Sequence, residues 1–165
     1  MSALLGTRYA AGMGAATVLA EMDFETRSEA GYVWDAAANK FRAPKGAAKK
    51  GLPAIGAARY AEHPSTDAQL FAYDLKDGQG VRQWMPGQPN PADLFAYLAR
   101  GGLIEAHNNM FERLIWRHVM ERRYGWPPVP AAQWRCSMAK ARAHALPGAL
   151  GMGLRNMMKG GDANR

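Results

Sequence analysis

The heptapeptide AEMDFET, residues 20–26, closes an apolar run and decides the fold of this chain. The run has the length and the β-branched start of a buried strand. Because side chains alternate between the two faces of a strand, Met22 and Phe24 would face a core. Asp23 and Glu25 would point the other way, and burying such charges without a partner is costly. The two acids are therefore either a metal-binding pair or, if the strand ends at Met22, solvated turn residues.

Length and composition bound the possible functions. The 165 residues are expected to form one domain over residues 17–150, with a poorly ordered lead-in (1–16) and an irregular tail (151–165). A net charge of +7 makes a polyanion a plausible partner. The single Cys136 excludes an internal disulfide and a cysteine-based zinc cluster, which fits a reducing, cytoplasmic compartment. No apolar run has the length of a membrane span, and the first sixteen residues lack a signal-peptide pattern.

A basic segment follows the first strand. Residues 27–59 show no clear periodicity and are expected to be a loop insertion punctuated by Gly and Pro. Between residues 40 and 59 the segment carries six Lys or Arg residues and no acid. It is either a solvated basic loop or a segment that follows a phosphate backbone, because Lys and Arg contacts to phosphate supply affinity for any sequence.

Strands and helices alternate in the rest of the chain. An Asp-Gly turn predicts a hairpin of two strands, and Asn90-Pro91 predicts a helix start with Asn90 as the capping residue. The order of elements predicts an α/β fold with a mixed sheet and the acidic strand at its centre. The expected strands are 68–75, 81–85, 103–106 and 134–137, and the expected helices are 91–101, 108–124 and 138–145.

Two residues near the start of the longest helix allow two interpretations each. Glu112 follows Asn109 by three positions, which is a capping-box pattern. Alternatively, a helix entering from a neighbouring strand would aim Glu112 at the face that carries Asp23 and Glu25, where three oxygen donors suit Mg²⁺ or Mn²⁺. His107 is either a structural histidine or a residue that orients a phosphate.

These residues resemble the motifs of a known family. DFET (residues 23–26) after an apolar strand, with Asn108, Phe111 and Glu112 after a later one, resembles the first two motifs of the proofreading 3′–5′ exonucleases. More narrowly, the chain is similar to the exonuclease region of phage-type family A DNA polymerases. The resemblance covers residues 17–150 and implies a ribonuclease-H-like mixed β-sheet flanked by helices. The supporting segments are residues 23–29, 59–66, 123–128, 135–138 and 145–148.

The resemblance also implies an activity and a site. The chain would remove nucleotides from a single-stranded DNA 3′ end or primer terminus, in a bacterial or phage-infected cell. A polymerase domain encoded downstream would be its partner, and no membrane is involved. Two Mg²⁺ or Mn²⁺ ions would be held by the catalytic acids Asp23, Glu25 and Glu112, the last replacing the more usual Asp. The residues that would contact the terminal nucleotide are Thr26, Asn108 and Phe111.

The chain departs from the family at its third motif, a Tyr or His followed a few residues later by Asp. After Glu121 the only acid is Asp162, and Met158 stands four residues before it. The C-terminal part of the fold is therefore expected to be incomplete. Two alternatives to an active exonuclease follow: a non-catalytic fragment that binds nucleic acid through its basic loop and Arg-rich helix, or an incompletely folded truncation product.

Overall fold

A mixed five-stranded sheet forms the body of the protein. The computed structural model describes residues 19–148, so the expected lead-in, the tail and Asp162 lie outside the described residues. The sheet has the order β5-β4-β1-β6-β7, with β1 antiparallel to β4 and parallel to β6, which places the acidic strand at its centre as expected. The five strands are β1 (Leu19–Arg27), β4 (Asp67–Asp74), β5 (Arg82–Trp84), β6 (Leu103–Ala106) and β7 (Trp134–Cys136).

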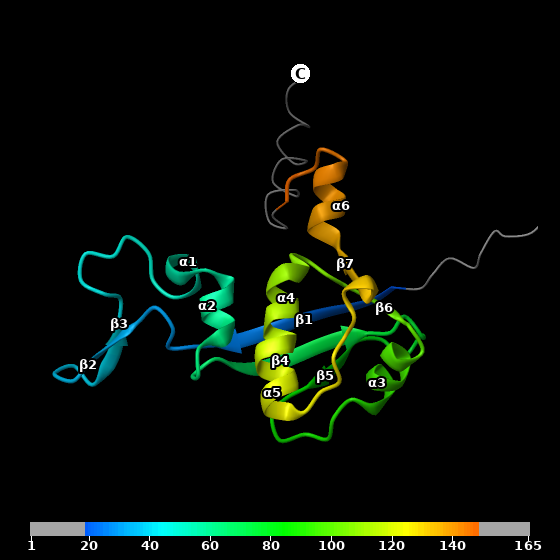
Figure 1. The fold of residues 1–165 in the computed structure, drawn as a ribbon, viewed down its shortest axis with the longest axis horizontal. Coiled ribbons are helices and arrows are strands. Elements are labelled where there is room, and N and C mark those ends of the chain that lie inside the picture. Colours follow the sequence, from blue (N-terminus) through cyan, green and yellow to red (C-terminus); the bar gives the residue numbers. More distant parts are fainter. Residues whose placement is uncertain (1–18, 149–165) are drawn as a thin grey trace, which may run out of the picture.

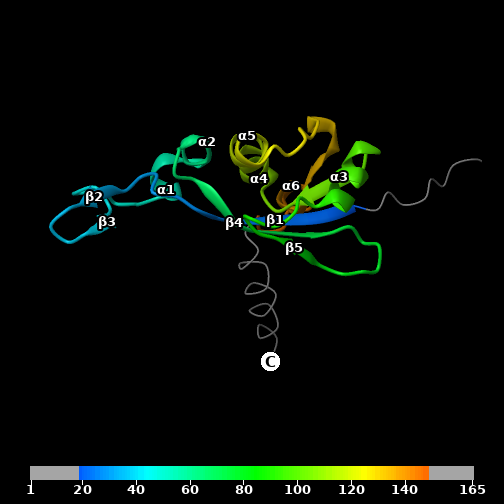
Figure 2. The ribbon, with the colours of Figure 1, turned by 90° about the horizontal axis from the view of Figure 1, so that it is seen from below.

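The longer helices cover one face of this sheet (Figures 1 and 2), and together with it they form the α/β fold expected from the sequence. A π-helical turn, η1 (Trp116–Met120), joins α4 (Asn109–Ile115) to α5 (Glu121–Tyr124), so that the longest expected helix is continuous. No helix within residues 19–148 is long and apolar enough to cross a membrane. The other helices are α1 (Leu52–Ile55), α2 (Ala57–Glu62), α3 (Ala92–Ala99), α6 (Ser137–Ala143) and the 3₁₀ turn η2 (Ala131–Gln133).

The core lies between β1, β4 and the helical layer. Met22 and Phe24 are buried, and the Phe24 ring packs against Phe71 of β4 with 4.6 Å between ring centroids. Burial of each such side chain stabilises the fold by about 2 kcal/mol. Asp23 and Glu25 lie within the same strand and are exposed on its other face. The interpretation of these acids as turn residues after a strand ending at Met22 is therefore wrong.

Two local expectations are also wrong. The segment 27–59 is not a continuous loop, because it contains a second, two-stranded sheet of β2 (Val33–Asp35) and β3 (Lys40–Arg42), α1 and the start of α2. Asn90 does not cap α3: its side-chain oxygen accepts a hydrogen bond from the Trp126 indole N–H at 3.0 Å, and the capping position falls on Pro91. The elements of the first segment are too short to produce a period in the sequence, and at α3 a tertiary contact takes the place of the expected cap.

Candidate functional site

The candidate site lies where β6 separates from β1. β6 pairs with β1 only from Leu19 to Glu21, so the edge of β1 beyond Glu21 has no strand partner on that side. The chain leaves β6 at Ala106 and enters α4 three residues later. The start of α4 therefore lies beside the part of β1 that carries Asp23 and Glu25, in the crevice that forms at the carboxyl end of a parallel strand.

Glu112, in the first turn of α4, is aimed at this free edge. Its side chain is buried, with 4% of the residue exposed, and its Oε2 has no hydrogen-bond partner among the described residues. Burial, and then the negative charges of Asp23 and Glu25, raise the pKa of Glu112 to about 8, while the backbone N–H of Phe24 acts in the opposite direction. The carboxylate thus lies against the backbone of β1.

The alternative role of Glu112 as part of a capping box is not what the structure shows. The capping position of α4 is Asn108, in the left-handed conformation (φ 61°, ψ 51°), and no side-chain capping bond is formed there. Asn tolerates this conformation better than most residues. The left-handed residue turns the chain sharply between β6 and α4, which allows the first helical turn to approach β1.

Asp23, Glu25 and Glu112 lie close enough together for their charges to interact. Partial desolvation of the carboxyl group, followed by the charge of Glu25, raises the pKa of Asp23, and the charge of His107 acts in the opposite direction. Within residues 19–148, the structure contains no group of three or more His, Cys, Asp or Glu side chains close enough together to hold a metal ion. The donor set nevertheless fits a hard divalent cation, since Glu112 has an unpartnered buried oxygen and the negative charges of Asp23 and Glu25 raise the pKa of this carboxyl group.

The three residues expected to contact a nucleotide lie around these acids, and two of them are joined by Tyr60 of α2. The Thr26 hydroxyl lies 3.1 Å from the Tyr60 hydroxyl, and the Phe111 ring packs against the Tyr60 ring at 5.9 Å. Asn108 is the residue at the turn into α4. Sequence reasoning missed the role of Tyr60, which directly follows the segment interpreted as a loop, although it lies within one of the supporting segments, residues 59–66.

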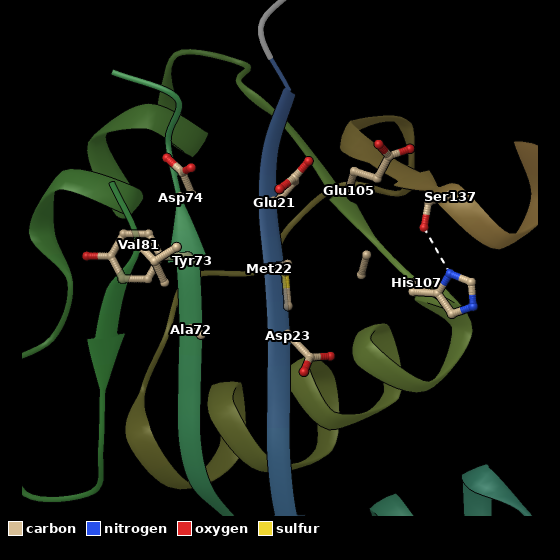
Figure 3. A pocket seen from close by; sticks show the side chains of 11 residues that line it. Glu21, Met22, Asp23, Ala72, Tyr73, Asp74, Val81, Glu105, His107 and Ser137 are labelled. Atoms are coloured by element: carbon tan, nitrogen blue, oxygen red, sulfur yellow. Dashed lines mark hydrogen bonds between the residues drawn. The ribbon is translucent and has the colours of Figure 1, made fainter. Parts of the chain in front are cut away.

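His107 lies beside Asp23 in a hollow on the open face of the sheet, shown in Figure 3. Its Nε2 lies 2.8 Å from the Gly148 carbonyl oxygen, which can only accept, so Nε2 carries a proton. Its Nδ1 lies 3.1 Å from the Ser137 hydroxyl. With both nitrogens bonded, His107 matches the structural interpretation, and it ties the start of α6 and the chain after it to the edge of the site. Ser137 carried no signal of this role in the sequence.

Comparisons with known proteins do not identify the chain. No family model matches it, and neither the curated proteins nor the solved structures contain a match.

Proposed function

We propose that this chain is the 3′–5′ exonuclease region of a DNA polymerase, which hydrolyses phosphodiester bonds from a single-stranded DNA 3′ end with two Mg²⁺ or Mn²⁺ ions. The position of Glu112 carries the proposal. It comes from α4, whereas Asp23 and Glu25 come from β1, yet its buried carboxylate is close enough to both for their charges to raise its pKa. One of its oxygens has no partner among the described residues.

The architecture supports the same proposal. The two sequence motifs, residues 23–26 and 108–112, fall on the central strand and at the start of α4. A mixed sheet with this strand at its centre is consistent with the ribonuclease-H-like fold that the motifs imply. Motifs that are distant in the chain thus meet at one place in the fold, as a shared site requires.

The residues have distinct roles in the proposed reaction. Two bound ions would supply an activated water and stabilise the leaving oxygen of the phosphodiester. Asp23 and Glu25 would hold the ions from the open face of β1, and Glu112 would hold them from the α4 side. Because the pKa of Glu112 is raised to about 8, this carboxyl would release its proton when it becomes a ligand. The terminal nucleotide would lie against Thr26, Asn108 and Phe111.

The decisive experiment is hydrolysis of a 5′-labelled single-stranded oligonucleotide, with Mg²⁺, with Mn²⁺ and with EDTA. We expect stepwise shortening with either ion, none in EDTA, and none in Asp23→Ala. Glu21→Ala is the matched control, because Glu21 is an exposed acid on the same face of β1 whose carboxylate pairs with Lys76 at 2.7 Å. Shortening that continues unchanged in Asp23→Ala would refute the proposal.

The same measurement separates the exonuclease from a non-catalytic nucleic-acid-binding fragment. That alternative predicts salt-sensitive binding of DNA with no metal-dependent shortening, even at high protein concentration. A sharp, cooperative thermal transition would exclude the incompletely folded product.

A further inference from the structure

Residues 32–50 form an arm that leaves the body and returns to it at a single place. The arm begins after Gly31 and ends before Gly51, and a Cβ on Gly31 would lie 3.1 Å from both the backbone N and O of Gly51. Gly51 is buried against the Tyr32 ring. Both glycines have positive φ (78° and 60°), a conformation that favours glycine, so they allow the two ends of the arm to touch. Figures 1 and 2 show the β2–β3 part of the arm projecting away from the sheet, beyond α1.

The root of the arm is fixed to the body by hydrogen bonds. The Ser28 and Thr66 hydroxyls lie 2.6 Å apart, and the Glu29 backbone N–H donates to the Ser65 hydroxyl at 2.8 Å. Thr66 is buried and its hydroxyl also donates to the Tyr60 carbonyl. The arm is therefore held at its base next to Thr26 and Tyr60, which belong to the candidate site.

The arm presents two aromatic rings to solvent. Trp34 and Phe41 lie opposite each other in the β2–β3 pair, with ring centroids 5.0 Å apart and ring planes at 64°. Trp34 is 53% exposed and Phe41 is 41% exposed. The other four tryptophans, in contrast, are buried. Exposed aromatic pairs of this kind mark interaction surfaces more often than isolated apolar residues do.

The same arm is strongly basic. It carries five cations and one acid, and the acid, Asp35, pairs with Arg42 at 2.6 Å. Within residues 19–148, no acid lies within ion-pair distance of the other four cations, which are Lys40, Lys45, Lys49 and Lys50. Positive charge that is not neutralised within the described chain is complementary to a polyanion.

We propose that the arm binds single-stranded DNA, with bases stacked on Trp34 and Phe41 and the phosphate backbone held by the lysines. Stacking platforms beside free cations are the usual means of binding single strands without sequence preference. An acidic polypeptide would satisfy the lysines but offers no succession of flat bases to the two rings. The choice of DNA rests on the proposed function, whereas the stacking and the charge rest on the arm alone.

The test is the affinity of the full chain for a fluorescein-labelled oligo(dT), measured by anisotropy in EDTA so that hydrolysis does not contribute. Trp34→Ala should raise the Kd about tenfold, since base stacking is lost. Trp34→Phe keeps a ring and should retain most of the affinity, whereas Trp34→Leu keeps apolar area without a stacking face and should behave like Trp34→Ala. The thermal midpoint of each variant should equal that of the parent chain, because Trp34 is outside the core.

The charge is tested by the salt dependence. Lys45→Ala should reduce the slope of log K against log salt concentration by about 0.7, the value for one phosphate contact on a single strand. Arg100→Ala is the matched control, because Arg100 is an exposed cation that follows α3, and Figure 1 shows α3 at the opposite end of the sheet from the arm. This variant should leave the slope unchanged.

The outcomes separate this proposal from the exonuclease. An unchanged Kd in Trp34→Ala, or equal affinities of the Trp34→Phe and Trp34→Leu variants, would overturn the proposed role of the arm even if metal-dependent shortening is observed. Conversely, a chain that loses affinity as predicted but never shortens DNA would overturn the exonuclease and leave the arm as a binding site.

Discussion

Replacing the buried acid of the candidate site should stabilise the metal-free protein. In the folded state the pKa of Glu112 is about 8, against 4.5 for an ordinary glutamate. Between these values the unfolded chain has released a proton that the folded chain retains, so stability falls as the pH rises from about 4.5 and becomes level above about 8. At pH 7 the accumulated cost is about 3 kcal/mol. Glu112→Gln removes this cost while keeping the size of the side chain.

The assay is urea unfolding of both proteins in EDTA, from pH 5 to pH 8.5. We expect the free energy of unfolding of the variant to exceed that of the parent chain by about 3 kcal/mol at pH 7. This difference should grow by about 1.4 kcal/mol for each pH unit up to pH 7.5. Glu29→Gln, which removes an exposed acid, controls for the loss of one negative charge. The reasoning is refuted if the difference between Glu112→Gln and the parent chain is independent of pH, or if the variant is the less stable protein at pH 7.

Three further predictions concern stability and can be measured by chemical denaturation. Trp126→Ala should cost about 4 kcal/mol, because this buried ring packs against aromatic side chains of both the sheet and the helices; a cost below 1 kcal/mol would contradict it. Tyr60→Phe should cost about 1 kcal/mol through loss of the hydrogen bond to Thr26, and the same change in a Thr26→Val background should cost nothing more. Gly102→Ala should cost about 2 kcal/mol, because the added Cβ would lie 2.3 Å from the Tyr97 ring. The ring is held in place by its hydroxyl, which donates a hydrogen bond to the Leu103 carbonyl oxygen at 2.7 Å. An unchanged denaturation midpoint would contradict this prediction and show that the ring can move away from the added Cβ.

Long, strongly patterned segments were predictable from the sequence. β1 was predictable because its apolar run has the length and the β-branched start of a buried strand, and the β4–β5 hairpin because of its Asp-Gly turn. β6 and the helix from 109 to 124 were also found with nearly the observed bounds. In contrast, β2 and β3 have three residues each, which is too short for a period to be recognised, and they pair away from the core.

The sequence singled out the acids of the candidate site but not the way in which the fold arranges them. Asp23, Glu25 and Glu112 were recognisable as acids in motif positions, but local pattern allowed Glu112 to be a capping residue. The tertiary structure excludes the capping role, because the helix start carries no side-chain capping bond, and it places Glu112 beside the free edge of β1. The role of Tyr60 depends on contacts with Thr26 and Phe111, which are distant in sequence, and no local rule could have identified it.

The contact between Gly31 and Gly51 has a consequence for how this protein can vary. The arm leaves the body after Gly31 and returns before Gly51, and these two residues lie side by side. The two attachment points on the body therefore stay the same whatever segment connects them. Loop length itself adds little entropic cost, about 0.6 kcal/mol for each doubling. We therefore expect the arm to be modular, so that shortening, lengthening or exchanging it leaves the sheet and the acids of the site unaltered.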